Sequence, residues 1–312
     1  MALTFISVLR EFELRENPSS DDIQANQIFD SFAYDPEGHS TRFARVIQNA
    51  QAAWEGSHII AEQDKVLGSG EDPRAFFWLD SPCISAPSHT REHGHVNKIY
   101  VHKLRKWFTL ILPKKMKAGK NWAPFVWNGD LHFVHSYSPF RVLKARFLSK
   151  HDDFMVLDTV AEHPIPTPKS FDRFSKFRGG SNALQWGDRI LGIGHTNERR
   201  GRASDTMIHR PFLFVYQPKR SVTYYAIDYD FAEEFRIVDP TSLFVKNGEL
   251  HLVTCETEFI WDRTPQRGRS CLYHLDIKGD FDEDSISFRR RRLHRWEHGE
   301  SSKIRRILGA WR

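Results

Sequence analysis

The chain has 312 residues, of which 40% are hydrophobic and 13% aromatic, enough apolar material for one large core or two smaller ones. Its net charge is +5, but nine Lys or Arg and two Glu fall within residues 289–312, so residues 1–288 carry the remaining −2. Because residues 1–288 are near neutral, nucleic-acid binding would have to rest on the basic segment 289–312 alone. No apolar run is long enough to span a bilayer.

The amino-terminal segment MALTFISVLREFELRE has an apolar stretch that is too short, and followed too soon by charge, for a signal peptide. The three cysteines, Cys83, Cys255 and Cys271, are odd in number and lack the spacing of a metal site. This favours a reducing compartment, although one disulfide is compatible with the count. We therefore expect a soluble protein with a cytoplasmic location.

Four later segments share one design, in which a polar opening precedes a short apolar strand, a tight turn and a second strand. They are GEDPRAFFWLDSP from Gly70, NWAPFVWNGDLHFVHSYSP from Asn121, GSNALQWGDRILGIGHT from Gly180 and DPTSLFVKNGELHLVTCET from Asp239. The turn glycines Gly129, Gly187 and Gly248 recur about every 60 residues, which suits a four-stranded propeller blade with long loops. Because residues 1–65 leave room for one more blade, we predict an all-β, five-bladed β-propeller over residues 1–288.

The repeat also predicts where polar side chains gather. Seven to nine residues before each turn lie Asp72, Asn121, Gly180 and Asp239. In a propeller the first strand of every blade lines the central axis, so these four positions are expected to ring one axial funnel. The alternative for Asp72 is purely structural, as the cap of a turn before Pro73.

Two other segments carry charge or histidine. The insertion SHTREHGHVNK holds His89, His93 and His95, which we interpret as a solvated loop because no cysteine or supporting pattern accompanies them. We expect no metal site. The chain has no GxGxxG, phosphate-binding GxxxxGK[ST] or GxSxG motif, so nucleotide hydrolysis and serine esterase chemistry have no support.

The basic segment 289–312 ends in SSKIRRILGAWR, where Ile304, Ile307, Leu308 and Trp311 recur at helical spacing. We predict a short basic amphipathic helix after the propeller. The favoured interpretation is a solvated helix that packs on its own domain. Contact with an anionic surface or a partner is the alternative, and specific nucleic-acid binding is the weakest interpretation. A protein that acts only as an interaction scaffold would use this tail as its anchor.

Four motifs occur in one order: GEDPR before a strand, KNWAPF before an Asn-Gly hairpin, GGS before a hairpin that ends in GIGH, and IHRPFLFVY. In this order they resemble the five-bladed propellers of glycoside hydrolase family 130, the β-mannoside phosphorylases and related transferases. The resemblance covers residues 60–275. It implies that Asp72 is the general acid of a reaction that makes or breaks a β-glycosidic bond, with mannose as the suggested sugar.

Physical chemistry supports the same role for Asp72. Burial disfavours the charged form of a carboxyl, so Asp72 is expected to hold a proton near neutrality and to give it to the leaving oxygen. The neighbouring Glu71 is expected to point to the opposite face of an extended strand and to pair with an arginine. Arg74 is expected to organise the turn or to contact the sugar.

A single acid suits inverting phosphorolysis, because phosphate itself attacks the anomeric carbon and no general base is needed. Inorganic phosphate or a sugar phosphate is then the co-substrate, with no bound cofactor. Phosphate needs a cationic cradle, and Gly179 and Gly180 are expected to let the backbone approach a ligand closely. The candidate phosphate contacts are Lys120, Arg178, His195, His209 and Arg210.

Two departures from the family pattern keep the reaction open. Ser138 stands where the family has a phosphate-binding arginine, with Arg141 nearby but displaced, and the run TCETE has Glu256 or Glu258 in place of an aspartate. Glycosyl transfer from a sugar-phosphate or nucleotide-sugar donor is therefore an alternative to phosphorolysis. So is hydrolysis, with Asp239 or one of these glutamates activating water. A non-catalytic glycan-binding propeller is the alternative from another class.

Carbohydrate binding is expected in each case. Asn121, Asp239, Glu256 and Glu258 can exchange hydrogen bonds with sugar hydroxyls. The tryptophans offer flat apolar surface, although propellers also pack Trp between blades. We expect Trp122, which follows Asn121 directly, to be the platform on which a sugar ring stacks. The other tryptophans considered are Trp127, Trp186 and Trp261.

Overall fold

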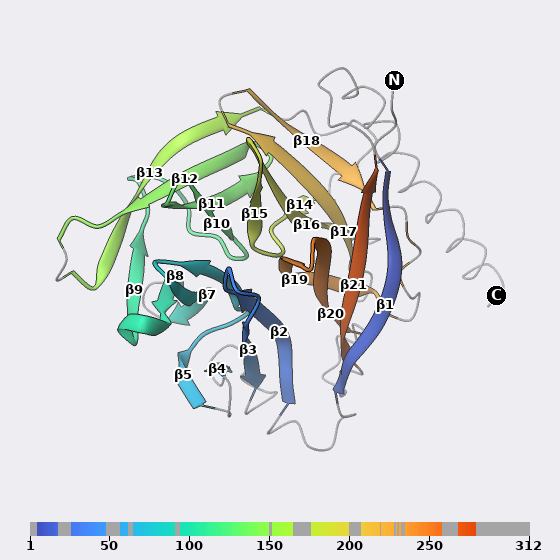
Figure 1. Ribbon diagram of the computed structural model, residues 1–312. Helices are drawn as coiled ribbons and strands as arrows, with labels where there is room; N and C mark the ends of the chain where they lie inside the picture. The colour runs from blue at the N-terminus through green and yellow to red at the C-terminus, as the bar shows by residue number, and fades with distance from the viewer. Residues whose placement is uncertain are drawn as a thin grey trace.

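The computed structural model describes residues 5–17, 26–47, 57–61, 65–90, 94–149, 152–164, 176–199, 207–218, 220–227, 229, 231, 235–257 and 268–278. These residues form β-strands and one 3-10 helix, η4 (His102–Leu104), and within them no helix has the length and apolar character needed to cross a membrane. The strands form five blades around a central axis, along which Figure 1 looks. This confirms the predicted all-β, five-bladed propeller. The predicted tail helix and the division at residue 288 lie outside the described residues and stay predictions.

Each blade is an antiparallel set of four strands. Blade I contains β2 (Asn26–Tyr34), β3 (Ser40–Ile47), β4 (Ser57–Ala61) and β5 (Lys65–Ser69). Blade II contains β6 (Arg74–Trp78), β7 (Ser81–Thr90), β8 (Gly94–Val101) and β9 (Lys106–Ile111). Blade III contains β10 (Ala123–Trp127), β11 (Asp130–Tyr137), β12 (Phe140–Arg146) and β13 (Phe154–His163).

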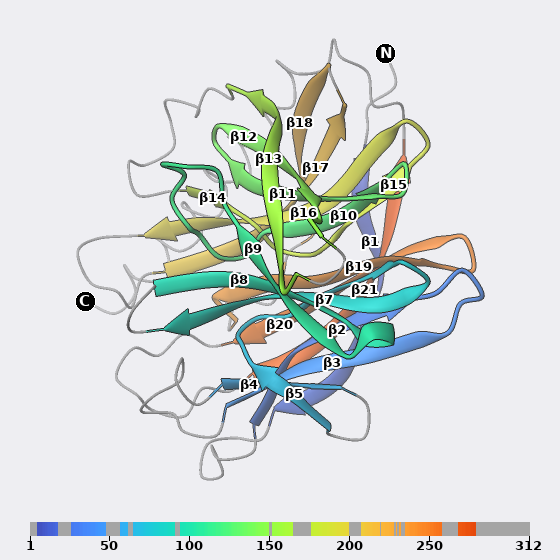
Figure 2. The ribbon, with the colours of Figure 1, turned by 90° about the vertical axis from the view of Figure 1, so that its left-hand side faces the viewer.

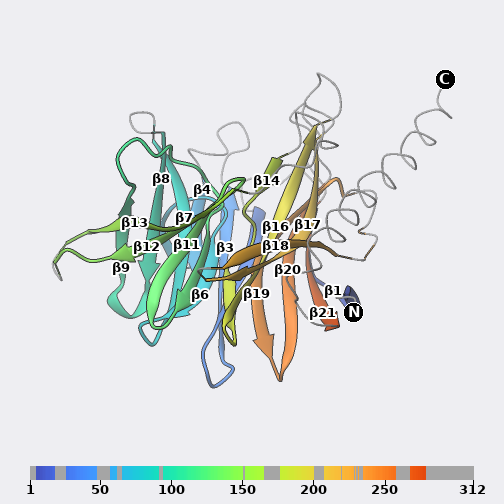
Figure 3. The same ribbon diagram turned by 90° about the horizontal axis from the view of Figure 1, so that it is seen from above.

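Blade IV has one additional short strand, and blade V takes its fourth strand from the amino-terminal part of the chain. Blade IV contains β15 (Ala183–Trp186), β16 (Arg189–Arg199), β17 (Met207–Gln217) and β18 (Ser221–Ala226), and the short β14 (Lys176–Arg178) pairs with β16. Blade V contains β19 (Ile237–Lys246), β20 (Glu249–Thr257), β21 (Gly268–Lys278) and the amino-terminal β1 (Phe5–Asn17). Figure 3 shows blades II and III on one side of the molecule, blades IV and V on the other, and blade I between them.

The amino-terminal strand closes the ring. β1 pairs antiparallel with β21, from Phe5 opposite Lys278 to Asn17 opposite Gly268. The two strands run side by side in Figures 1 and 2. Blade I is therefore built from residues 26–69, and the segment before it belongs to blade V rather than to the first blade.

The predicted hairpin turns are confirmed by their backbone. Both central residues have positive φ in the turns Leu79–Asp80, Asn128–Gly129 and Asn247–Gly248, as a two-residue type I′ turn requires. Gly187 has φ 61° in the corresponding turn of blade IV. These turns fix which residues of each hairpin face the neighbouring blades.

Apolar side chains fill the spaces between blades. Separate buried clusters lie between blades I and II, II and III, III and IV, and IV and V. Their largest members include Phe43, Phe133, Phe212 and Tyr273. The innermost strands contact one another in sequence around the ring, with β2 against β6, β6 against β10, β10 against β15, β15 against β19, and β19 against β2. The openings of these five strands therefore share the axis.

Candidate active site

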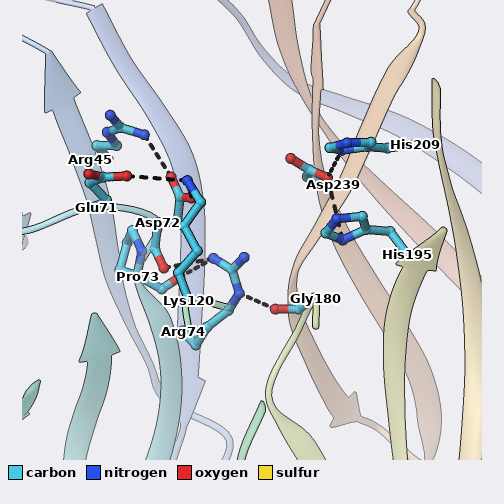
Figure 4. Close-up of polar contacts among 10 residues, drawn as sticks. All are labelled: Arg45, Glu71, Asp72, Pro73, Arg74, Lys120, Gly180, His195, His209 and Asp239. Atoms are coloured by element: carbon cyan, nitrogen blue, oxygen red, sulfur yellow. Dashed lines mark hydrogen bonds and ion pairs between the residues drawn. The ribbon is translucent and has the colours of Figure 1, made fainter. Parts of the chain in front are cut away.

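The repeat brings the predicted axial residues together. Asp72 and Asn121 precede β6 and β10, Gly180 precedes β15, and Asp239 lies in β19; their side chains or backbone are buried. Figure 4 shows Asp72 on one side and Asp239 on the other, with Arg74 reaching from the first side to Gly180. Asp72 and Asp239 thus bring carboxylates from blades II and V to equivalent positions of the repeat.

Arg74 holds the turn that carries Asp72. Its Nη1 donates to the carbonyl oxygens of Asp72, at 2.7 Å, and Pro73, at 3.2 Å, and its Nε donates to the carbonyl oxygen of Gly180. Asp72 has φ 40°, a left-handed conformation that an aspartate keeps only when its surroundings enforce it. Of the two roles expected for Arg74, the structure shows the organiser of the turn. The same side chain ties blade II to blade IV.

Cations determine the charge of Asp72. Arg45 from β3 places Nη1 2.7 Å from Oδ1, and the Lys120 ammonium lies 3.8 Å from Oδ2. Burial alone raises the pKa of Asp72, but Arg45, Lys120 and Arg74 together outweigh it and hold this pKa below the ordinary value. The expectation that Asp72 keeps a proton near neutrality is therefore wrong for this arrangement, because it treated the buried carboxyl as unpaired.

Glu71 lies beside the same ammonium. Its Oε2 is 3.4 Å from Lys120 Nζ, so its cation is a lysine and not the arginine that we expected. The left-handed backbone at Asp72 breaks the alternation of an extended strand, and both neighbouring carboxylates can then reach Lys120. Lys120 is 34% exposed, whereas both carboxylates are buried, so it is the solvent-facing cation of this group.

The opposite side of the site contains Asp239 and two histidines from β16 and β17. His209 Nδ1 lies 2.7 Å, and His195 Nδ1 3.5 Å, from Asp239 Oδ1. The two imidazole rings stack with centroids 4.4 Å apart and an interplanar angle of 24°. The strand register explains the grouping, since β16 and β17 are antiparallel neighbours and His209 pairs with Ile237, two residues before Asp239.

Burial lowers the pKa of His195 to about 3, with His209, Arg178 and Arg74 acting in the same direction and Asp239 opposing them. For Asp239, burial raises the pKa, but His209, His195 and Arg74 bring it well below the usual range. His195 is thus a neutral imidazole and Asp239 a carboxylate at neutral pH. Within the proposed phosphate cradle, His195 can act as a hydrogen-bond donor but not as a cation.

The glycines at the start of blade IV are required by backbone packing. A Cβ on Gly179 would lie 1.4 Å from the carbonyl oxygen of Asn121, and one on Gly180 would lie 2.4 Å from that of Ile193. The close approach that we expected toward a ligand is therefore an approach to neighbouring backbone. Asn121 has φ 64°, and its buried Oδ1 has no hydrogen-bond partner among the residues that the structure describes.

Three predicted site residues serve the framework instead. Trp122 is only 2% exposed and packs in the cluster between blades II and III, so it offers no face on which a sugar could stack. Glu256 is fully buried in blade V, where it pairs with Arg269 at 3.0 Å and accepts a hydrogen bond from the Tyr273 hydroxyl. Arg210 donates through Nη1 to the carbonyl oxygens of Phe235, at 3.2 Å, and Arg236, at 3.0 Å. The direction of these side chains depends on blade packing, which the linear pattern did not contain.

The remaining candidates divide between the site and other places. Arg178 pairs through its backbone with His195 and is close enough to influence that imidazole. Arg141 forms an ion pair with Glu162 at 2.8 Å on the outer strands of blade III, away from Asp72. Glu258, together with Trp261, lies outside the described residues.

The sequence analysis missed two charged residues of blade I, Arg45 and Asp30. Asp30 lies eight residues before Gly38, so the rule that identified Asp72 and Asn121 would also have found it. Its carboxylate accepts hydrogen bonds from Arg42 Nε at 2.7 Å and from Ser270 Oγ at 2.5 Å. Arg45 lies within an alternating strand, and only the folded ring brings it to Asp72.

No family model matches this sequence, and no curated protein sequence matches it. Solved structures do match the fold. One is MPT-4, a mannose phosphorylase from Leishmania mexicana in complex with phosphate ion, with a TM-score of 0.52 and 13% identity over 86% of this chain and 93% of the other.

A second similar structure comes from work on the GH130 family of mannoside phosphorylases. That work describes glycoside hydrolases in this family, which target β-1,2-mannosidic linkages in Candida mannan. It has a TM-score of 0.51 and 8% identity, over 83% of this chain and 94% of the other. The chain therefore shares its propeller fold with mannoside phosphorylases, which is the structural similarity that the motifs predicted.

Proposed function

We propose that this protein is a carbohydrate-active enzyme that makes or breaks a β-glycosidic bond, with Asp72 as the acid, by phosphorolysis or glycosyl transfer. The observation that supports it best is the placement of Asp72. Its carboxylate lies at the propeller axis beside the half-exposed Lys120, on the opposite side of the site from Asp239. The similar folds of a mannose phosphorylase and of a GH130 structure suggest a mannoside as the substrate class.

In phosphorolysis a phosphate oxygen forms a bond to the anomeric carbon, the bond from that carbon to the leaving oxygen breaks, and Asp72 transfers its proton to that oxygen. Lys120 is the cation best placed to contact phosphate, because it adjoins the acid and its side chain is more exposed than those of Arg45 and Arg74. Asn121 and Asp239 are buried polar groups suited to sugar hydroxyls.

The low pKa of Asp72 favours a charged co-substrate over water. Three cations keep this carboxylate ionised in the free protein, so it needs a change of surroundings before it can donate a proton. A phosphate group that binds Lys120 adds negative charge and weakens the hold of that ammonium on Asp72, and both effects raise the pKa of Asp72. Water carries no charge and produces neither effect, which supports phosphorolysis or transfer over hydrolysis.

A non-catalytic glycan-binding propeller is the second candidate. The 2.7 Å contact between Arg45 and Asp72 favours it, because a carboxylate kept in a buried ion pair has no proton to give. Such a protein would bind sugars through the same axial groups.

The test is acceptor-dependent phosphate release from sugar 1-phosphates, mannose 1-phosphate first, with the wild type, Asp72→Asn and the control Asp188→Asn in an exposed turn. We expect the rate to fall on the order of 10² to 10⁴ in Asp72→Asn and to stay unchanged in the control. The alternative result is a wild type that turns over no sugar 1-phosphate, nucleotide sugar or hydrolysable mannoside, and a sugar affinity that survives Asp72→Asn. This result would establish the non-catalytic glycan-binding propeller instead.

A further inference from the structure

The cluster of His195, His209 and Asp239 has the composition of a metal site. The three residues come from the neighbouring strands β16, β17 and β19, and one ligand atom from each lies within 4.8 Å of the others. Both Nδ1 atoms face the same carboxylate oxygen, at 2.7 Å for His209 and 3.5 Å for His195. Figure 4 shows the two stacked rings side by side, each next to the carboxylate of Asp239.

A second observation is independent of this spacing. Both ring nitrogens of His195 and Nε2 of His209 are buried without a hydrogen-bond partner among the residues that the structure describes. Buried polar atoms without a partner destabilise a folded protein, so natural structures rarely keep three of them together. An ion bound beside Asp239 would accept a lone pair from one nitrogen of each ring, which for His195 is the unpartnered Nδ1.

We propose that His195, His209 and Asp239 bind a divalent transition-metal ion of the Zn²⁺ class. Two imidazoles and one carboxylate suit Zn²⁺ and its first-row neighbours, whereas Mg²⁺ and Ca²⁺ prefer oxygen ligands alone. Neutral histidine is the form that coordinates a metal. Three protein ligands leave a coordination position for water or for an oxygen of a bound sugar or phosphate. This site differs from the histidine-rich insertion that the sequence analysis considered.

The surrounding charges determine the strength of binding. Arg74 and Arg178 are close enough to act on His195, and both repel a cation. The carboxylate of Asp239 opposes them within the site itself. We therefore expect weaker binding than in a structural zinc site, and a chelator that removes the ion without unfolding the propeller.

The experiment is a titration of the full chain, freed of metal by a chelator, with Co²⁺, whose visible absorption reports coordination by nitrogen, followed by competition with Zn²⁺. We expect one ion per chain in the wild type and a loss of affinity of at least about tenfold in His209→Ala and in Asp239→Asn. His39→Ala is the matched control, because Asp35, Glu37 and His39 form an exposed group with similar ligands. It should keep the wild-type affinity.

His209→Gln serves if His209→Ala fails to fold, and circular dichroism of each metal-free variant checks the fold. Absence of Co²⁺ absorption in the wild type would overturn the proposal, as would equal affinity in the wild type and both cluster variants, or a loss caused by His39→Ala. The measurement needs no turnover, so failure of the proposed enzyme activity would leave this result unaffected.

Discussion

At the level of single residues, the protonation of Asp72 is decided by side chains from separate parts of the chain. Arg45 comes from blade I, Lys120 from the segment before blade III, and Arg74 from the strand that follows Asp72 itself. Each favours the carboxylate, and together they reverse the effect of burial. The acid role that we propose therefore depends on what the substrates do to these three cations.

We predict that the destabilisation caused by Arg45→Met depends on pH within a defined window. The folded-state pKa of Asp72 lies below its unfolded value, so the ion pair stabilises the native state above the unfolded carboxyl pKa of about 3.9. That contribution is lost as pH falls through the lower, folded value. Breaking this buried pair should cost about 3 kcal/mol at pH 7 and progressively less as the solution becomes acidic. Urea unfolding across this range measures it.

The matched variant is Arg45→Met combined with Asp72→Asn. It removes both charges, so no buried carboxylate is left without its partner, and it should recover part of the stability that the single substitution loses. An Arg45→Met protein that is equally destabilised at every pH would show that the side chain contributes by packing rather than by charge.

At the level of strands and turns, the glycines of blade IV show how local and distant contacts differ. The turn glycines act within their own hairpins, whereas Gly179 is fixed by the backbone of Asn121, 58 positions earlier. We predict that Gly179→Ala destabilises the protein by about 3 kcal/mol or more, because its Cβ would overlap a carbonyl oxygen that belongs to another blade.

Gly119→Ala is the comparison for that substitution. The nearest atom to its added Cβ is Trp122 Nε1 at 3.7 Å, an ordinary contact, so the change should stay within about 0.5 kcal/mol of the wild type. Equal stability of the two variants in urea would contradict the close approach at Gly179.

The same contrast explains which parts of the site could be predicted. Tight hairpin turns depend on two adjacent residues, so the hairpins and the axial positions of Asp72, Asn121 and Asp239 follow from sequence spacing. The partner of Asp72 and the burial of Trp122 and Glu256 depend on which blade packs on which face. A single sequence contains no direct signal for that packing.

At the level of the whole molecule, the junction between blades I and V joins the first blade of the chain to the last and closes the ring. Aromatic packing and hydrogen bonds both contribute to it: Phe244 of β19 stacks on Tyr34 of β2, with ring centroids 4.2 Å apart, and lies 6.4 Å from the ring of Phe32. Ser31 Oγ donates to the carbonyl oxygen of Thr241 at 3.0 Å, and Ser242 Oγ donates to that of Phe32 at 2.9 Å. Pairing of β1 with β21 joins the two ends of the propeller beside this junction.

We predict that a chain lacking residues 1–17 loses stability and solubility together. Without β1 the outer edge of β21 has no backbone partner over Gly268–Lys278, and an unpaired edge both destabilises the blade and invites association between molecules. Loss of a few kcal/mol of stability from a protein of this size should lower the unfolding temperature by about 10 °C.

A synthetic peptide of residues 5–17, added in trans, should restore part of that loss, whereas a scrambled peptide should not. Calorimetry and light scattering would measure both effects. A truncated chain that stays monomeric with an unchanged unfolding temperature would show that the contacts between blades I and V close the ring without β1.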